Sequence, residues 1–133
     1  MEQEHTVSPA DVLLVGYGTG SRRITGAFKA RGVRFIVVEK DSQVAAEARA
    51  DGHAVIEGDA SDSTTLGAAA VEVVDLVAIT TEQRNEEIAR AVRSRRPKGV
   101  ILTTLPAGFA ESEDSTTRMI GRMTRILDYA TRR

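Results

Sequence analysis

One short segment of the chain combines glycines with hydroxyl and charged side chains: Gly16, Tyr17, Gly18, Thr19, Gly20, Ser21 and Arg22. An apolar run, Asp11–Val15, leads directly into this segment, and apolar residues at helical spacing follow it. When a strand turns into a helix through glycines, the free backbone N–H groups of the first helical turn bind anions, aided by the helix dipole. Gly16 suits a tight turn, and Gly18 lacks a side chain that would block a diphosphate. Residues 16–22, the glycine turn, are therefore predicted to hold the phosphates of a ligand.

The glycine spacing departs from the usual dinucleotide-binding pattern at one position. The third glycine of that pattern, which lets helix and strand pack closely, is replaced by Ser21, and Gly20 lies one position earlier. We expect serine to cost little of this closeness, and its hydroxyl to cap the helix or to bind phosphate. The alternative is that these glycines only form a loop, so other residues must decide whether a nucleotide binds.

The acidic residue at the end of the second apolar run is suited to a ribose. Glu39 follows Gly18 by about 20 residues, where a carboxylate accepts hydrogen bonds from the ribose hydroxyls and repels a 2′-phosphate. Glu39 therefore favours NAD(H), ADP or ATP over NADP, although the adjacent Lys40 weakens this preference because it is able to accept a phosphate. The alternative is a solvated carboxylate at a strand end.

Two further pairs of residues follow predicted strands. Asp59, which precedes Ala60, is expected to accept a hydrogen bond from the exocyclic amine of adenine, to cap the next helix, or to do both. Thr80 and Thr81 end the strand expected beside the first one, where their hydroxyls would meet ribose or phosphate. The carboxyl ends of parallel strands share one edge of the sheet, so Glu39 and both pairs are predicted to converge there on the glycine turn.

The elements that must position these residues alternate along the chain. Apolar, β-branched runs predict strands at residues 11–15, 33–38, 53–56, 73–79 and 100–105. Helical patterns follow them, one ending at Gly32 and the others at about residues 42–50, 62–70, 83–95 and 116–132. This alternation predicts an α/β fold: a Rossmann-like, doubly wound parallel sheet of five to six strands in three layers, α/β/α. We expect a polar leader (1–10), a nucleotide-binding domain (11–106), and a connection with a C-terminal amphipathic helix (107–133).

The composition excludes several classes of function. The 133 residues make one domain, and a net charge of -1 gives no basic surplus for binding nucleic acid. The chain has no cysteine, which excludes disulfides and cysteine-ligated zinc, and two histidines argue against a histidine metal site. No apolar run reaches the roughly 18–20 residues that cross a bilayer, and the N-terminus lacks a signal-peptide core. We therefore expect a cytoplasmic protein without direct membrane insertion.

A resemblance to a known family rests on four segments and one further residue. These are Val12–Arg23, Val37–Asp41, Val55–Asp62 and Leu66–Thr81, followed by Asn85. Over roughly residues 11–105 the sequence resembles the nucleotide-binding domain of potassium-transport regulators, the RCK or TrkA N-terminal domain. The resemblance places Gly16, Gly18 and Ser21 in the family's glycine turn, Arg22 at the diphosphate, Glu39 at the ribose and Asp59 near adenine. The sixth strand and the C-terminal ligand-binding subdomain usual in this family are not found in the sequence.

The resemblance implies a non-catalytic sensor. Such domains bind NAD(H) or the adenine nucleotides ATP, ADP or AMP, and pass the ligand state to a potassium channel, uptake system or antiporter. They usually form homodimers or higher oligomers such as octameric rings. A membrane cation channel or transporter is therefore the expected partner.

The last predicted helix carries an apolar stripe: Met119, Ile120, Met123, Ile126, Leu127 and Ala130. Arg118, Arg122 and Arg125 alternate with it. The stripe predicts either a helix packed on the sheet or a protruding helix that pairs with its copy in a dimer. Acidic residues upstream balance the arginines, which argues against a nucleic-acid role.

Two other functions stay open beside the sensor. A small NAD-dependent oxidoreductase is one, but no substrate domain remains after the sheet, and no candidate histidine base lies near its active edge. Neither Tyr17 nor Tyr129 is followed four residues later by lysine, so the pair typical of short-chain dehydrogenases is missing. The other is a degenerate scaffold that lost its ligand and acts by protein interaction, for which Ser21 is the main argument.

Overall fold

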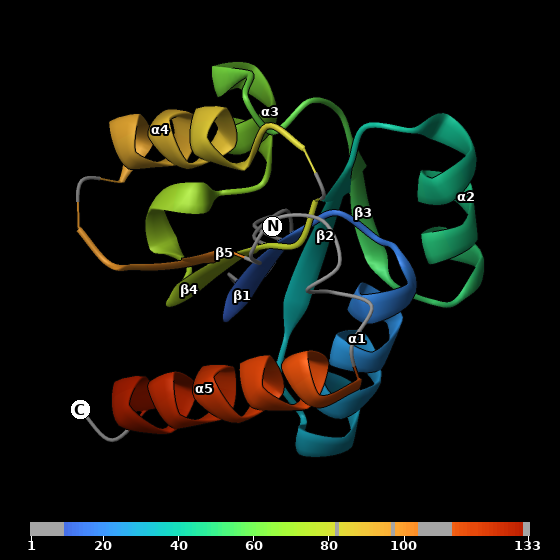
Figure 1. The fold of residues 1–133 in the computed structure, drawn as a ribbon. Helices are drawn as coiled ribbons and strands as arrows, with labels where there is room; N and C mark the ends of the chain where they lie inside the picture. The colour runs from blue at the N-terminus through green and yellow to red at the C-terminus, as the bar shows by residue number, and fades with distance from the viewer. Residues whose placement is uncertain (1–9, 82, 97, 104–112, 132–133) are drawn as a thin grey trace, which may run out of the picture.

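A parallel sheet forms the centre of the computed structural model, which describes residues 10–81, 83–96, 98–103 and 113–131. Its strands are β1 (Val12–Val15), β2 (Phe35–Glu39), β3 (Ala54–Glu57), β4 (Leu76–Ile79) and β5 (Val100–Thr103). Their order in space is β3-β2-β1-β4-β5 (Figure 1). The chain builds outward from β1 in one direction and then in the other, so the topology switches between β1 and β4, where such sheets bind ligands. The predicted Rossmann-like α/β fold is confirmed.

Helices cover both faces of the sheet. They are α1 (Thr19–Arg31), α2 (Ser42–Ala50), α3 (Ser63–Ala68), α4 (Asn85–Arg95) and α5 (Glu113–Thr131), with a short 3-10 turn, η2 (Val71–Val73). The helices α1, α2 and α5 lie on one face, and α3 and α4 on the other (Figure 1).

Burial on both faces explains the continuous apolar run of the first strand. Leu13 and Val15 point into the core under α3 and α4, whereas Val12 and Leu14 point into the core under α1 and α5. All four side chains are at most 2% exposed. A strand of this kind needs apolar residues at every position, which is typical of parallel sheets covered by helices.

Local side-chain chemistry sets several helix ends. Asp41 caps α2 by accepting hydrogen bonds from the backbone N–H groups of Gln43 and Val44, and Asp62 caps α3 in the same way through Thr64. Gly32 ends α1 with a left-handed φ of 72°. The prediction that Asp59 caps α3 is therefore wrong.

The structure corrects one strand. The predicted strand 73–79 begins only at Leu76, because η2 takes up residues 71–73. This turn follows Ala70, which has a left-handed backbone (φ 55°), and it leaves Val73 57% exposed. A β-branched, apolar sequence was therefore insufficient to extend the strand.

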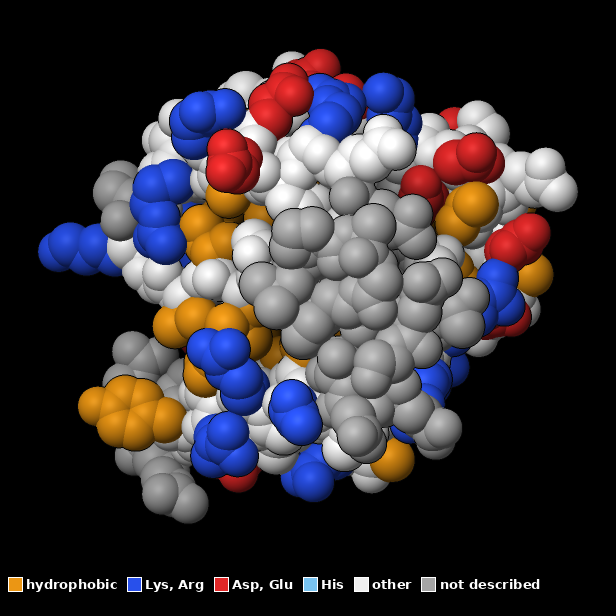
Figure 2. Space-filling model, viewed as in Figure 1, with side chains coloured by type: hydrophobic (Ala, Val, Ile, Leu, Met, Phe, Trp, Pro, Cys, Tyr) orange, Lys and Arg blue, Asp and Glu red, His pale blue; other side chains and the backbone are white. Residues whose placement is uncertain are grey.

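The C-terminal helix packs on the sheet. Met119, Met123 and Leu127 are at most 7% exposed and lie in the core that β1 and α1 share. The prediction that this helix packs on the sheet is thus confirmed, with Ile120 and Ile126 partly buried against the same core. Figure 2 shows Lys and Arg side chains gathered over the exposed side of this part of the molecule.

Some predictions lie outside the described residues. These are the leader up to residue 9, the end of the fifth strand beyond residue 103, and the connection up to residue 112. In the part of the chain that the structure describes, no helix combines the length and the apolar character needed to span a membrane.

Candidate functional site

The first glycine of the turn is required by close packing between the ends of β1 and β4. Gly16 has a φ of +98°, and a Cβ there would lie 2.9 Å from Thr80 Oγ1 and 3.1 Å from Thr81 Cγ2. Its backbone N–H donates to the carbonyl oxygen of Val38 at 2.9 Å, which joins the turn to β2. Gly16 therefore has a structural reason to be glycine.

The second glycine has no such reason. Gly18 is the N-cap of α1, its φ of -102° suits any residue, and a Cβ built there meets no atom within 4 Å. No side chain caps the helix at this position. The N-terminus of α1 therefore offers its first-turn N–H groups, with their partial positive charge, beside an exposed glycine. This is the geometry that an anionic ligand requires.

The serine at the third glycine position forms a buried hydrogen bond. Ser21 is 2% exposed, and its Oγ lies 2.7 Å from Thr80 Oγ1. Thr80 donates its single hydroxyl proton to the carbonyl oxygen of Val15 at 2.8 Å, so Ser21 must be the donor to Thr80. This Ser21–Thr80 bond ties α1 to β4. The expected helix cap by Ser21 is wrong, and its hydroxyl points into the fold.

The ribose acid is held in place by the backbone. Glu39 accepts one hydrogen bond from the N–H of Tyr17 and one from the N–H of Asp41, each at 2.9 Å. A carboxylate has about four acceptor sites, so two remain for ribose hydroxyls. Glu39 is therefore positioned between the glycine turn and the start of α2, and it is not the freely solvated carboxylate of the alternative interpretation.

The tyrosine of the turn points away from the carboxyl edge of the sheet. Its hydroxyl donates to Asp51 Oδ2 at 2.6 Å and lies 3.1 Å from Nε2 of His53, the residue before β3. Burial and the hydrogen bond to Asp51 raise the pKa of Tyr17 to about 12, because both favour the neutral phenol. Only the backbone of Tyr17 contributes to the site.

Arg22 is also turned away from the glycine turn. Its guanidinium forms an ion pair with Glu47 at 2.6 Å, lies 3.7 Å from Asp51, and stacks 5.0 Å from the centre of the Tyr17 ring. In this structure Arg22 therefore holds α1 against α2. A contact with a diphosphate, as the resemblance implies, requires another side-chain rotamer.

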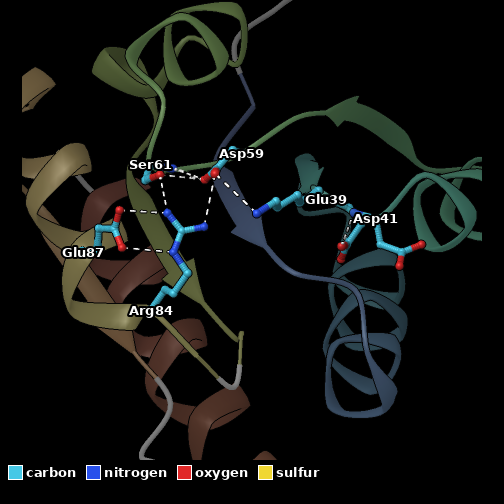
Figure 3. Close-up of polar contacts among 7 residues, drawn as sticks. Glu39, Asp41, Asp59, Ser61, Arg84 and Glu87 are labelled. Atoms are coloured by element: carbon cyan, nitrogen blue, oxygen red, sulfur yellow. Dashed lines mark hydrogen bonds and ion pairs between the residues drawn. The ribbon is translucent and has the colours of Figure 1, made fainter.

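Asp59 lies in a network of charged and polar groups after β3 (Figure 3). Its Oδ1 accepts from the backbone N–H and the hydroxyl of Ser61, at 2.9 and 2.7 Å. Its Oδ2 accepts from Arg84 at 3.1 Å and lies 3.7 Å from Lys40 Nζ. The hydrogen bonds from Ser61, followed by those from Arg84, hold the pKa of Asp59 far below its usual range. Both oxygens are therefore already engaged.

The remaining residues predicted for the site, Ala60, Thr81 and Gly20, lie in different environments. Ala60 is 4% exposed and packs in the core. Thr81 donates its hydroxyl proton to Asn85 Oδ1 at 2.5 Å, at the start of α4. Gly20 is half-buried in the first turn of α1, which begins at Thr19.

One residue of this edge was missed. Arg84 bonds Asp59, Ser61 and Glu87, yet nothing in its sequence context marks it. The described residues contain no group of three or more His, Asp or Glu side chains that would hold a metal ion.

The fold, the glycine turn and the positioned acid after β2 agree with one protein family. The TrkA-N domain family model matches residues 12–116. This chain belongs to the TrkA-N domain family. The TrkA-N assignment fits the open N-terminus of α1 and the position of Glu39.

Solved structures share this TrkA-N fold. The TrkA-N domain of inner membrane protein ybaL from Escherichia coli superposes with a TM-score of 0.67 at 22% identity, over 87% of this chain and 84% of that one. The GsuK channel bound to NAD gives 0.66 at 16%, over 87% and 21% of the two chains. GsuK bound to ADP gives 0.64 at 18%, over 86% and 30%.

A putative prephenate dehydrogenase from Corynebacterium glutamicum has a TM-score of 0.59 at 17% identity, over 84% of this chain and 34% of that one. At these identities the likeness concerns the fold alone, and this TrkA-N domain spans less than a third of the GsuK chains. A search of curated protein sequences gives no match to the chain.

Proposed function

We propose that this TrkA-N domain is a non-catalytic regulatory domain that binds NAD(H) or an adenine nucleotide (ATP, ADP or AMP). The observation that carries the proposal is the uncapped N-terminus of α1 at Gly18, where glycine serves no packing need of the protein itself. GsuK, which has the same fold, is described bound to NAD and to ADP, and this supports the ligand class.

The diphosphate and the ribose of the ligand each have a partner in this arrangement. The backbone N–H groups at the start of α1 hold the diphosphate, and the two free acceptor sites of Glu39 hold the ribose hydroxyls. Glu39 and the neighbouring Asp41 both carry negative charge, which disfavours a 2′-phosphate and therefore NADP. Ser21 and Thr80 keep α1 and β4 together beneath the ligand.

The biological context of the proposal is the control of a cation transporter from the cytoplasmic side of the membrane. ybaL is described as an inner membrane protein and GsuK as a channel, which supports a potassium or other cation transporter as partner. We propose a homodimer or higher oligomer in which nucleotide binding shifts the population between two arrangements of the subunits. A ligand achieves this only if it binds one arrangement more tightly than the other.

The rival function is an NAD-dependent oxidoreductase, favoured by the fold shared with the dehydrogenase. Enzymes use histidine most often for proton transfer, and tyrosine serves in the same role. His53, however, precedes β3, and the phenol of Tyr17 is committed to Asp51 with a raised pKa. The described part of the edge therefore favours binding over catalysis. A scaffold without any ligand is the third candidate, but Ser21 fits the turn and gives it no support.

Thermal denaturation with NAD⁺, NADH, ADP, ATP, AMP and NADP tests the proposal. At a ligand concentration of 100 Kd, binding stabilises a protein by about 2.7 kcal/mol, or roughly 10 °C in Tm for a chain of this size. Stabilisation without turnover of NADH supports the regulatory domain. No stabilisation by any nucleotide overturns it in favour of the scaffold, and turnover with a substrate panel overturns it in favour of the enzyme.

A matched pair of variants tests the ribose contact. Glu39 and Glu57 are register partners on β2 and β3. Glu39→Gln is expected to weaken NAD(H) or ADP binding about tenfold and to reduce discrimination against NADP, because one charged acceptor is lost. Glu57→Gln, which removes the same charge one strand away, is expected to leave both unchanged. Equal effects of the two variants contradict the assigned role of Glu39.

A further inference from the structure

Arg84 has an unusual backbone at the carboxyl edge of the sheet. With φ 65° and ψ 20°, it occupies the left-handed region as the N-cap of α4. An L residue with a long side chain rarely adopts this conformation, and such strain persists where surrounding contacts hold it. Four hydrogen bonds from its guanidinium to three residues provide that hold.

These hydrogen bonds use the edges of the guanidinium plane. Nε and Nη2 bond the two oxygens of Glu87 at 3.0 and 2.8 Å, in a bidentate arrangement. Nη2 also donates to Ser61 Oγ at 2.9 Å, and Nη1 donates to Asp59 Oδ2 at 3.1 Å (Figure 3). The N–H donors of a guanidinium lie in its plane, so four of the five are engaged edge-on. The side chain is nevertheless 37% exposed. Because the edges of the guanidinium are engaged, a new ligand would have to meet it through its flat surface.

The charge of Arg84 is already neutralised. Asp59 and Glu87 both contact its guanidinium, so a phosphate approaching Arg84 would also approach two carboxylates. The hydrogen bonds to Glu87 and Asp59, and then the charges of these carboxylates, raise the pKa of Arg84 above its usual range, which keeps the group protonated. An uncharged, planar, aromatic group is the ligand that suits such a surface, because arginine stacks on aromatic faces.

The position of Arg84 fits the base of a nucleotide. Asp59 Oδ2 contacts both Arg84 and Lys40, and Lys40 directly follows the ribose acid Glu39. A base joined to a ribose at Glu39 would therefore lie beside this network. Asp59 already accepts three hydrogen bonds, so at most one of its roughly four acceptor sites remains for the adenine amine. That site is on Oδ2, which Lys40 Nζ also approaches to 3.7 Å, so the amine would compete there with an ammonium group.

We propose that Arg84 is the base-stacking residue of the nucleotide site and that Asp59 is its positioning residue. This inference rests on the proposed binding of an adenine nucleotide to the glycine turn. It has a specific consequence: the site recognises the flat surface of the base and not its exocyclic amine. ADP and IDP, whose bases differ at that amine, then bind with similar affinity.

Calorimetric titration of the whole chain with ADP and IDP tests the proposal. The informative variant is Arg84→Gly, because glycine adopts the left-handed backbone without strain and keeps the start of α4 intact. Arg90→Ala, which truncates an exposed arginine on the same helix, is the matched control. For the wild type we expect ADP and IDP affinities within about threefold of each other. Arg84→Gly is expected to weaken both by about fivefold, the scale of an exposed cation–π contact, and Arg90→Ala to change neither.

The other outcomes separate this proposal from the function on which it rests. If the wild type binds ADP tenfold or more tightly than IDP, Asp59 reads the amine and the stacking proposal is overturned. Unchanged ADP affinity in Arg84→Gly assigns Arg84 a purely structural role, and increased affinity shows that its side chain blocks the site. Either result overturns the stacking proposal but leaves the proposed nucleotide binding intact. Absence of ADP binding to the wild type instead overturns the proposed nucleotide-binding function.

Discussion

Gly16 and Gly18 lie two residues apart in the glycine turn, and alanine at the two positions is expected to have opposite effects. In Gly16→Ala the new Cβ lies 2.9 Å from Thr80 Oγ1, an atom held by hydrogen bonds to Val15 and Ser21. The positive φ adds about 1–2 kcal/mol of backbone strain, and overpacking adds about 1–3 kcal/mol. A total of about 3 kcal/mol corresponds to a Tm roughly 10 °C lower for this chain length.

Gly18→Ala is expected to affect binding and spare stability. Its extended φ of -102° allows alanine, and the added Cβ meets no protein atom within 4 Å. The cost is about 0.5 kcal/mol, because alanine is a poorer N-cap than glycine. The methyl group would, however, project where a diphosphate approaches the backbone, so affinity for ADP or NAD(H) is expected to fall by tenfold or more.

Thermal denaturation without ligand and calorimetric titration with ADP measure the two effects separately. We expect a large loss of Tm with Gly16→Ala and a large loss of affinity for ADP with Gly18→Ala. A drop in Tm of equal size in both variants would refute the described packing of the turn. Unchanged ADP affinity in a folded Gly18→Ala protein would show that the diphosphate is held elsewhere.

Three further predictions concern the contacts around this turn. Ser21→Gly removes a buried hydrogen bond and is expected to lower the free energy of unfolding, measured by chemical denaturation, by about 1–2 kcal/mol. If the losses from Ser21→Gly and Thr80→Val simply add in the double variant, the Ser21–Thr80 bond is contradicted. Because the pKa of Tyr17 is raised to about 12, the free energy of unfolding should keep its full value below pH 10 and fall by at most about 2.7 kcal/mol toward pH 12. Tyr17→Phe should abolish this loss, and Tyr129→Phe should retain it. Burial lowers the pKa of His53, so the neutral ring stabilises the fold above about pH 6.5, and this stabilisation is lost as the pH falls. Chemical denaturation at pH 5 and pH 7.5 should therefore show a smaller loss of stability on acidification for His53→Gln than for the wild type.

Residues whose structure depends on near neighbours in the sequence were predicted well. The strands around Leu14 and Val37 follow from apolar runs that two helical layers cover. The start of α2 at Ser42 agrees with the helical pattern expected from about residue 42. These features are visible because they depend on the pattern of consecutive residues.

Residues whose partners lie far along the chain were not predictable in the same way. Arg84 bonds Asp59, 25 positions earlier, and Tyr17 bonds Asp51, 34 positions later. Arg22 carries the charge expected of a residue that binds phosphate, yet Glu47 on α2 and Asp51, which follows α2, attract it. Only the packing of the helices decides between such competing partners, so composition and spacing leave them undetermined.

The Ser21–Thr80 bond bears on how chains of this family are recognised. A search pattern that demands glycine at the third position of the turn would reject this chain, although α1 still begins at Thr19 and Ser21 is buried without a gap. The hydroxyl of Ser21 bonds a hydroxyl that lies 59 positions later in the sequence. In this chain, the serine of the turn is therefore to be considered together with Thr80, the residue that follows β4.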